Sequence, residues 1–232
     1  MTHSEFSDTF DVLVRSTVHN EEGLRTFMFD EYEKSVFLTK AQDEIFIALY
    51  TGKGTYEGFE STEELRRYLD SLNKTKTYTE EDRIEDQIGV STNSIFYELP
   101  EDLAFITMEQ VTYADETLDC YDGSTASVYP VTQDEYSTIK GNPFRGPTKY
   151  KVIRLDHEGN MVELISKYNI GTYLLKYLTK PKPIILDNLP EGLSINGYSE
   201  ITECELRPTL HNLILNRAVQ LALQSQGTSE NK

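Results

Sequence analysis

The spacing of apolar residues changes twice along this sequence, and that change restricts the chain to a mixed fold. Over the first third, apolar residues recur at intervals of three and four, the period of one helix face. From about Tyr78, β-branched and aromatic residues gather in short runs between turn signals, which is typical of strands. A helical pattern returns at Pro208. We therefore predict an α+β fold, in which N-terminal helices and a C-terminal helix form a helical layer, with an antiparallel β lobe in the middle.

The N-terminal third predicts three helices. The first depends on spacing alone and carries Phe6, Phe10, Leu13 and Thr17. Two later starts have capping boxes, in which an Asp or Ser precedes a Glu by three residues: Asp30 with Glu33, and Ser61 with Glu64. Gly52 is placed to end the second helix, so the string Gly52-Lys-Gly predicts a helix stop and not a phosphate loop.

The middle of the chain predicts strands with one short helix. Strands are expected at 94–99, 103–113, 151–155, 161–166 and 172–178, and turn signals suggest that the last three form an antiparallel meander. The charged segment at 79–86 is interpreted as a solvated connection. A short helix is expected from Thr132 to Lys140, with Thr132 as its cap and Glu135 at the third position.

The C-terminal helix, from Pro208 to Gly227, has two apolar stripes and should be buried on more than one side. We assign Leu213 and Ile214 to contacts within the chain and Leu223 to contacts in an assembly. The expected organisation is an N-terminal helical segment at 1–76 and a β-rich lobe at 77–206. The helix at 207–227 packs on the N-terminal helices, and 228–232 form a flexible tail.

The sequence contains no motif for catalysis or for a cofactor. None of the histidines His3, His19, His157 and His211 accompanies a nucleophile motif such as GxSxG, and no spacing typical of a zinc or calcium site occurs. Cys120 and Cys204 lie far apart and are interpreted as buried small hydrophobes. No apolar run of about 18 residues and no secretory signal is present. We expect no enzyme, no metal, no cofactor and no membrane association.

Charge is distributed unevenly along the chain. The net charge is −17, yet residues 140–182 hold nine bases against three acids, a net +6 that leaves −23 for the remainder. An acidic protein is a poor wrapper of nucleic acid, whereas opposed charged faces suit contacts between subunits. A solvated sheet face is the other interpretation.

The string Asn142-Pro-Phe-Arg-Gly-Pro predicts a rigid turn that presents Phe144 and Arg145 outward. Aromatic and Arg residues are frequent hot spots of protein interfaces, although the turn could also be a plain loop. Candidate contacts with other proteins are therefore Phe144, Arg145, Lys176, Lys180, Lys182 and Leu223.

Five strings together resemble a structural protein of crAss-like bacteriophages: the runs that begin at Asp30, Val131, Asn142 and Leu178, and Cys204-Glu-Leu-Arg-Pro with Arg217-Ala-Val-Gln-Leu-Ala. The resemblance extends from about Phe6 to Gln224 and implies a neck or connector ring protein of the virion, below the portal. It brings no catalytic residues.

The resemblance implies a set of partners. These are copies of the chain itself in a twelve-fold ring, the portal protein, other neck or tail ring proteins, and packaged DNA that passes through the lumen without sequence recognition. Assembly in the bacterial host cytoplasm is implied as well. The alternatives are another virion component, such as a tail-tube, cargo or assembly protein, and an enzyme whose active site has no sequence signal.

Overall fold

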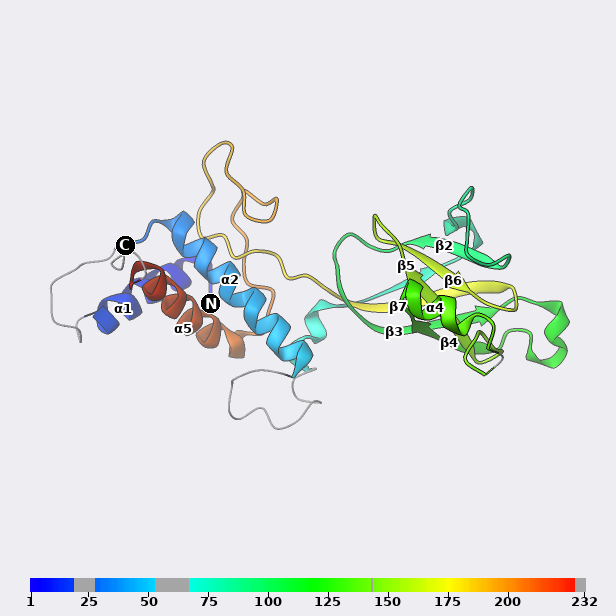
Figure 1. Cartoon of the computed structure of the whole chain (residues 1–232). Helices are drawn as coiled ribbons and strands as arrows, with labels where there is room; N and C mark the ends of the chain where they lie inside the picture. The colour runs from blue at the N-terminus through cyan, green and yellow to red at the C-terminus, as the bar shows by residue number, and fades with distance from the viewer. Residues whose placement is uncertain (19–27, 53–66, 143, 228–232) are drawn as a thin grey trace. The chain divides into compact units, whose positions relative to one another are not determined.

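The computed structural model describes residues 1–18, 28–52, 67–142 and 144–227 (Figure 1). The chain divides into two compact units. The helical unit combines both ends of the chain, Met1–Leu72 with Pro181–Lys232, and the β unit is Asn73–Lys180. The long helices lie outside the stretch of sequence that holds the antiparallel-rich sheet, which confirms the predicted α+β class.

Three helices and one 3-10 turn are described in the helical unit: α1 (His3–Val18), α2 (Glu31–Thr51), α5 (Pro208–Gly227) and η1 (Asp70–Leu72). The capping box at Asp30 is confirmed, because its carboxylate accepts a hydrogen bond from the Glu33 amide while the Glu33 side chain accepts one from the Asp30 amide. Gly52 ends α2 with a left-handed φ of 63°, as predicted. The predicted helix start at Ser61 lies outside the described residues.

The core of the helical unit is formed where α5 lies against α2 and α1 (Figure 1). Arg217 of α5 joins Glu44 of α2 through an Nε to Oε2 contact of 2.7 Å. Lys34 of α2 is buried, and its ammonium lies 2.9 Å from both Asp11 of α1 and Glu31. A buried ammonium is tolerated only with such partners, so this cluster fixes how α1 meets α2.

Residues 181–206 belong to the helical unit, whereas the sequence-based division placed them in the β lobe. The reason is a set of hydrogen bonds from polar side chains of α2 to this extended segment. The Ser35 hydroxyl accepts from the Leu186 amide at 3.0 Å, and the Gln42 amide donates to the Lys182 carbonyl at 2.7 Å. Ile184, Ile185 and Leu186 are all buried. Apolar runs of this length predict strands, but here the amides of Ile184 and Leu186 donate to side chains of α2.

The β unit contains one seven-stranded sheet in the order β1-β7-β3-β4-β5-β6-β2. Its strands are β1 (Asn73–Tyr78), β2 (Ser94–Glu98), β3 (Leu103–Tyr113), β4 (Thr125–Pro130), β5 (Lys151–Asp156), β6 (Met161–Ile165) and β7 (Ile170–Thr179). Two 3-10 turns, η2 (Glu80–Asp82) and η3 (Glu116–Tyr121), follow β1 and β3. All pairs are antiparallel except β4 with β5. Parallel neighbours need a crossover connection, and this one contains α4 (Gln133–Ile139).

Helix α4 covers one face of the sheet. It has the predicted cap, since the Thr132 hydroxyl accepts a hydrogen bond from the Glu135 amide. Tyr136 and Ile139 of α4 pack on Ile153 of β5 and its neighbours, Leu155 and Ile165. Val152 of β5 faces the opposite core cluster. Strand β5 is therefore buried on both faces, which explains its nearly continuous apolar sequence.

The predicted three-stranded meander is wrong at its third strand. Strand β6 pairs with β5 and β2, whereas β7 pairs with β3 and β1. The turn that follows β6 is held by the segment that follows β3. There the Asn169 amide donates to the Asp115 carboxylate at 2.8 Å. The Ala114 amide donates to the Asn169 carbonyl at 3.0 Å. These bonds bring the start of β7 to the end of β3.

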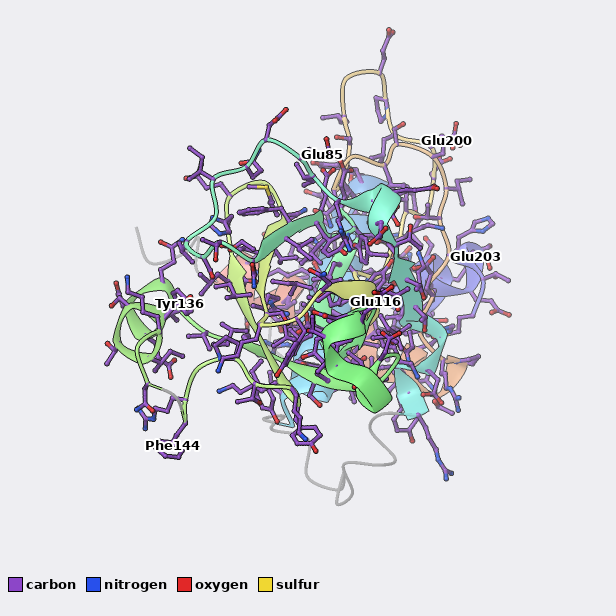
Figure 2. The ribbon with its side chains drawn as sticks, turned by 90° about the vertical axis from the view of Figure 1, so that its right-hand side faces the viewer. Glu85, Glu116, Tyr136, Phe144, Glu200 and Glu203 are labelled. Carbon is purple, nitrogen blue, oxygen red and sulfur yellow. The ribbon has the colours of Figure 1, made fainter. Side chains whose placement is uncertain are left out.

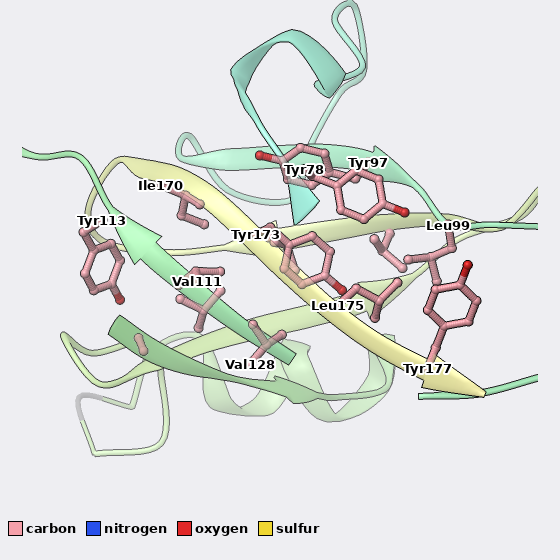
Figure 3. Packing of buried hydrophobic residues seen from close by; sticks show 14 of the residues in the cluster. Tyr78, Tyr97, Leu99, Val111, Tyr113, Val128, Ile170, Tyr173, Leu175 and Tyr177 are labelled. Atoms are coloured by element: carbon pink, nitrogen blue, oxygen red, sulfur yellow. The ribbon is translucent and has the colours of Figure 1, made fainter. Parts of the chain in front are cut away.

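The two edge strands of the curled sheet meet through tyrosine side chains (Figure 3). Tyr78 of β1 and Tyr97 of β2 have ring centroids 5.2 Å apart, and Tyr173 of β7 lies 5.3 Å from Tyr78 in a stacked arrangement. The Tyr78 hydroxyl also donates to the Glu98 carbonyl of β2 at 2.7 Å. Side chains, not backbone ladders, thus connect the first and last strands of the sheet.

A buried ion pair lies beside this aromatic core. Arg154 of β5 contacts Glu109 of β3, and both side chains are more than 90% buried. The Tyr173 hydroxyl donates to the same carboxylate, and Asp156 lies 2.9 Å from the Arg154 Nε. Burial, reinforced by the negative charge of Glu109, raises the pKa of the Tyr173 phenol. Burial also raises the pKa of Tyr78 and Tyr97.

These raised pKa values predict a loss of stability in alkali. An unfolded tyrosine ionises near pH 10, whereas the buried phenols stay protonated to higher pH, so their contribution is complete below about pH 10 and falls above it. We expect the free energy of unfolding of the full chain, from urea melts at pH 8 to 11, to decline above about pH 10. The difference in unfolding free energy between the wild type and Tyr173→Phe should become smaller over that range, because phenylalanine has no phenol to ionise. Tyr150→Phe, at an exposed side chain, is the control and should show no such trend.

Candidate assembly surfaces

Asn142 organises the turn between α4 and β5. Its amide donates to the Ile139 carbonyl at 2.8 Å, and its own carbonyl accepts from Arg145 and Gly146 at 3.2 and 2.9 Å. Its side-chain oxygen accepts from the Phe144 amide at 2.9 Å. A Cβ at position 146 would lie 3.1 Å from the Asn142 carbonyl, so the close approach of the backbone favours glycine there.

The turn presents Phe144 and Arg145 outward, as the sequence predicted. Phe144 is 92% exposed and lies at the tip of the segment, beyond Tyr136 of α4 (Figure 2). Lys151 of β5 donates from its ammonium to the Arg145 carbonyl at 3.0 Å, which attaches the turn to the sheet. Because hydrogen bonds hold the backbone of the turn, Phe144 loses little backbone freedom on binding, which favours a role as an anchor.

Aromatic and basic side chains continue beyond the turn. The Lys149 ammonium lies 4.9 Å from the ring centroid of Tyr150, and the Lys151 ammonium lies 5.2 Å from that of Tyr129. Tyr150 is 63% exposed and Tyr129 is 50% exposed. Sequence analysis missed both tyrosines, although the alternation of Tyr150 with Lys149 and Lys151 was a usable signal. We call the set Phe144, Arg145, Lys149, Tyr150, Lys151 and Tyr129 the turn surface.

The basic segment at 140–182 does not form one continuous patch. Arg154 is internal and neutralised by Glu109. Lys182 belongs to the helical unit, where its ammonium lies 3.1 Å from Glu205. Lys176 lies half-buried in the middle of β7, and Lys180 is exposed just after that strand. The count of bases along the sequence therefore overstates the basic surface near the turn.

Most of the apolar surface of α5 is covered within the helical unit. Ile214 of the first stripe is fully buried, and so are Leu215 and Val219 of the second. Leu213 and Leu223 are both half-buried, so the expected division, with Leu213 inside and Leu223 in an assembly contact, is not visible in their burial. The assembly contact of Leu223 stays a prediction.

A Ser, a Glu and a His meet in the β unit, but in an order that does not suit a serine nucleophile. The carboxylate of Glu163 accepts hydrogen bonds from the Ser94 hydroxyl and from the Val90 amide, and His157 Nε2 lies 2.9 Å from its other oxygen. A serine nucleophile needs the imidazole between the hydroxyl and the acid. Here the fully buried Glu163 stands in the middle, so the cluster ties the loop before β2 to β6 and β5.

Cys204 and His211 are held by hydrogen bonds within the helical unit. The Cys204 thiol donates to Gln42, and burial raises its pKa to about 11, which keeps it protonated at neutral pH. His211 Nε2 lies 3.0 Å from the Leu206 carbonyl. Among the described residues, no cluster of three or more His, Cys, Asp or Glu side chains could hold a metal. None of the helices in the described part is long and apolar enough to cross a membrane.

Comparisons with known proteins identify relatives of this chain. A family model described as phage tail ring protein 3/4 matches residues 1–232. The chain is 48% identical over 229 residues to "Ring protein 3" of Bacteroides phage crAss001, an alignment that covers 97% of this chain and 96% of that protein. It is 33% identical over 238 residues to "Ring protein 4/5" of the same phage, with 96% and 92% covered. The resemblance to crAss-like phage proteins is thus confirmed, and the chain belongs to the phage tail ring protein 3/4 family.

Proposed function

We propose that this chain is a non-enzymatic subunit of a ring in the neck of a crAss-like phage virion. The ring lies below the portal, joins capsid to tail and surrounds the channel through which DNA passes. Its partners are further copies of the chain in a twelve-fold ring, the portal, and adjacent neck or tail ring proteins. The subunits are made and assembled in the cytoplasm of the bacterial host.

The observation that carries this proposal is the similarity to named ring proteins along nearly the whole chain. Identity is higher to Ring protein 3, at 48%, than to Ring protein 4/5, at 33%. We therefore infer that the chain occupies the position that Ring protein 3 has in its own phage. Because both alignments cover more than nine-tenths of each protein, the two units of this chain correspond to whole relatives and not to one shared module.

Surface chemistry supports a ring role over an enzymatic one. A subunit of a cyclic ring needs two unlike surfaces, because each copy contacts one neighbour with one face and the other neighbour with a different face. The turn surface provides one such face, with Phe144 as an apolar anchor and Arg145 beside it. By contrast, the Ser94, Glu163 and His157 cluster lacks the arrangement of an acyl-transfer site.

The net charge of −17 suits a channel for DNA. Phosphates are attracted by clustered Lys and Arg and repelled by acidic surfaces, so an acidic lumen would let DNA slide without sticking. Sequence is read through contacts with base edges, and an acidic lumen that repels DNA makes none. Passage of DNA would then be independent of its sequence.

The first test is assembly with the portal. We expect the purified chain alone to be a monomer or small oligomer. Co-expression with the portal and the other ring proteins should produce stacked rings that contain it, detected by native mass spectrometry and electron microscopy. A chain that never joins the stack, or joins only the tail tube or the capsid interior, would contradict the proposed position.

The second prediction concerns the turn. Phe144→Ala and Arg145→Glu should leave the thermal melt unchanged, because both side chains are exposed, and should reduce incorporation into the rings. Ile88→Ala and Lys40→Glu are the matched controls, since Ile88 is 98% exposed in the β unit and Lys40 is exposed on α2. Normal incorporation of both turn variants would show that the turn is only a loop.

The third prediction separates stability from assembly on α5. Ile214→Ala should cost about 2–5 kcal/mol of unfolding free energy, because it empties a fully buried site. Leu223→Ala should cost less, since that side chain is half-buried, and should weaken ring incorporation. Urea melts and the ring assay measure the two effects. If Leu223→Ala assembles normally, the residue has no assembly role.

Lys176, Lys180 and Lys182 remain further candidates for contacts between subunits or rings.

A further inference from the structure

A projecting segment of the helical unit, at 187–203, has a built conformation of its own. Its base is closed by paired bonds between Ile185 and Thr202, both at 3.2 Å, and the Leu189 amide donates to the Ser199 carbonyl at 2.8 Å. It contains a two-residue turn in which Asn196 and Gly197 have φ of 52° and 85°. Asn-Gly with two positive φ angles is favoured in tight hairpins. We call this segment the acidic arm.

The arm is acidic and partly apolar on its surface. Residues 183–206 contain no Lys, Arg or His, and the arm itself carries Asp187, Glu191, Glu200 and Glu203. Leu193, Tyr198 and Ile201 are 42%, 41% and 39% exposed. Within the described part of the chain, no ion pair engages Glu200 or Glu203. These carboxylates are therefore available to a cation from outside.

A hollow on the arm lies next to one of these carboxylates. It is lined by Asn188, Leu189, Ser199, Glu200 and Ile201. Its walls are fixed, because the Asn188 side chain accepts a hydrogen bond from the Ile201 amide at 3.2 Å. An apolar edge at Ile201 thus stands beside the acid Glu200 on a preorganised backbone.

The turn of the β unit has the complementary chemistry. Residues 136–155 contain no Asp or Glu, and Lys140, Arg145, Lys149 and Lys151 follow one another along them. Phe144, almost fully exposed, precedes Arg145 directly, just as Glu200 directly precedes Ile201 on the arm. Each surface offers one apolar group and one charge, of opposite sign on the two sides.

We propose that the acidic arm of one subunit receives the turn of the neighbouring copy of this chain. The Phe144 ring occupies the hollow against Ile201, and the Arg145 guanidinium pairs with Glu200. This inference rests on the proposed ring function, and it identifies the two faces through which neighbouring copies join. Because turn and arm are different surfaces, each copy can give its turn to one neighbour and receive the turn of the other on its arm, which is the head-to-tail contact of the ring proposed above.

Two other surfaces fit the turn less well. In the hollow lined by β3, β4 and β5, Glu109 is already engaged by Arg154 and Tyr173. Helix α5 contains no acidic residue. The arm combines exposed carboxylates, exposed apolar side chains and the absence of any base over 183–206.

Photo-crosslinking tests the contact directly. p-Benzoylphenylalanine at position 144, in rings assembled with the portal and the other ring proteins from an equal mixture of light and ¹⁵N-labelled chains, should form crosslinks to residues 187–203. Mass spectrometry should find light peptides joined to heavy ones. The same probe at position 88, equally exposed, should give no arm product. Products confined to one copy, to another protein or to another segment would overturn the proposal.

Charge reversal tests the named pair. Arg145→Glu and Glu200→Lys should each lower the apparent affinity of subunits for one another in the ring about tenfold. The double variant should recover most of that loss. Glu85→Lys, an equal charge change at an exposed site, combined with Arg145→Glu, should recover nothing. If wild-type rings form but the double variant shows no recovery, the pairing is wrong and the ring function stands. If the wild-type chain forms no ring, the proposed function itself fails.

Discussion

Contact between the two edge strands of the curled sheet is the interaction on which the β unit depends. Strands β1 and β2 end the sheet at opposite sides, and Tyr78, Tyr97 and Tyr173 bring them together. Aromatic pairs contribute about 0.5–1.5 kcal/mol each beyond their buried area, so these contacts are a sizeable share of a domain stability of about 5–15 kcal/mol. Edge strands are otherwise sites of aggregation, and closing them through side chains reduces that exposure.

The closed core also determines which charges reach the surface. Because Arg154 and Glu109 face a buried region, neither could be left there alone without a large desolvation cost. Their pairing removes one base from the surface beside the turn, while Lys149 and Lys151 remain with exposed tyrosines. The turn surface is therefore set by the sheet beneath it and not by the number of bases in the sequence.

Local signals predicted local structure well, because their physical cause lies within a few residues. The caps at Asp30 and Thr132, the helix stop at Gly52 and the outward turn at Phe144 all depend on groups within four positions. Strand order failed because pairing is non-local: the partner of β7 is fixed by Asp115, more than fifty residues from the turn it holds. The same reason hid residues 181–206, whose backbone partners lie on α2.

The acidic arm was overlooked although Asn196-Gly197 is a strong hairpin signal. Its sequence carries no motif for catalysis or metal binding. Its significance depends on comparing exposed groups on two units that are remote in the sequence. That comparison needs the burial of Phe144 and Ile201, which depends on three-dimensional structure.

In the proposed contact, the apolar group contributes most of the affinity and the charged groups determine the choice of partner. An exposed pair such as Arg145 with Glu200 adds only about 0–1 kcal/mol, so it could not hold a subunit in a ring by itself. Burying Phe144, which stands almost entirely in solvent, contributes the larger part through its apolar surface. The charges instead select the partner, because two turns repel each other, as do two arms, whereas a turn attracts an arm. That selection disfavours the turn-to-turn dimer that a lone exposed phenylalanine would otherwise permit, and it favours contacts between a turn and an arm, which a head-to-tail ring repeats around its axis.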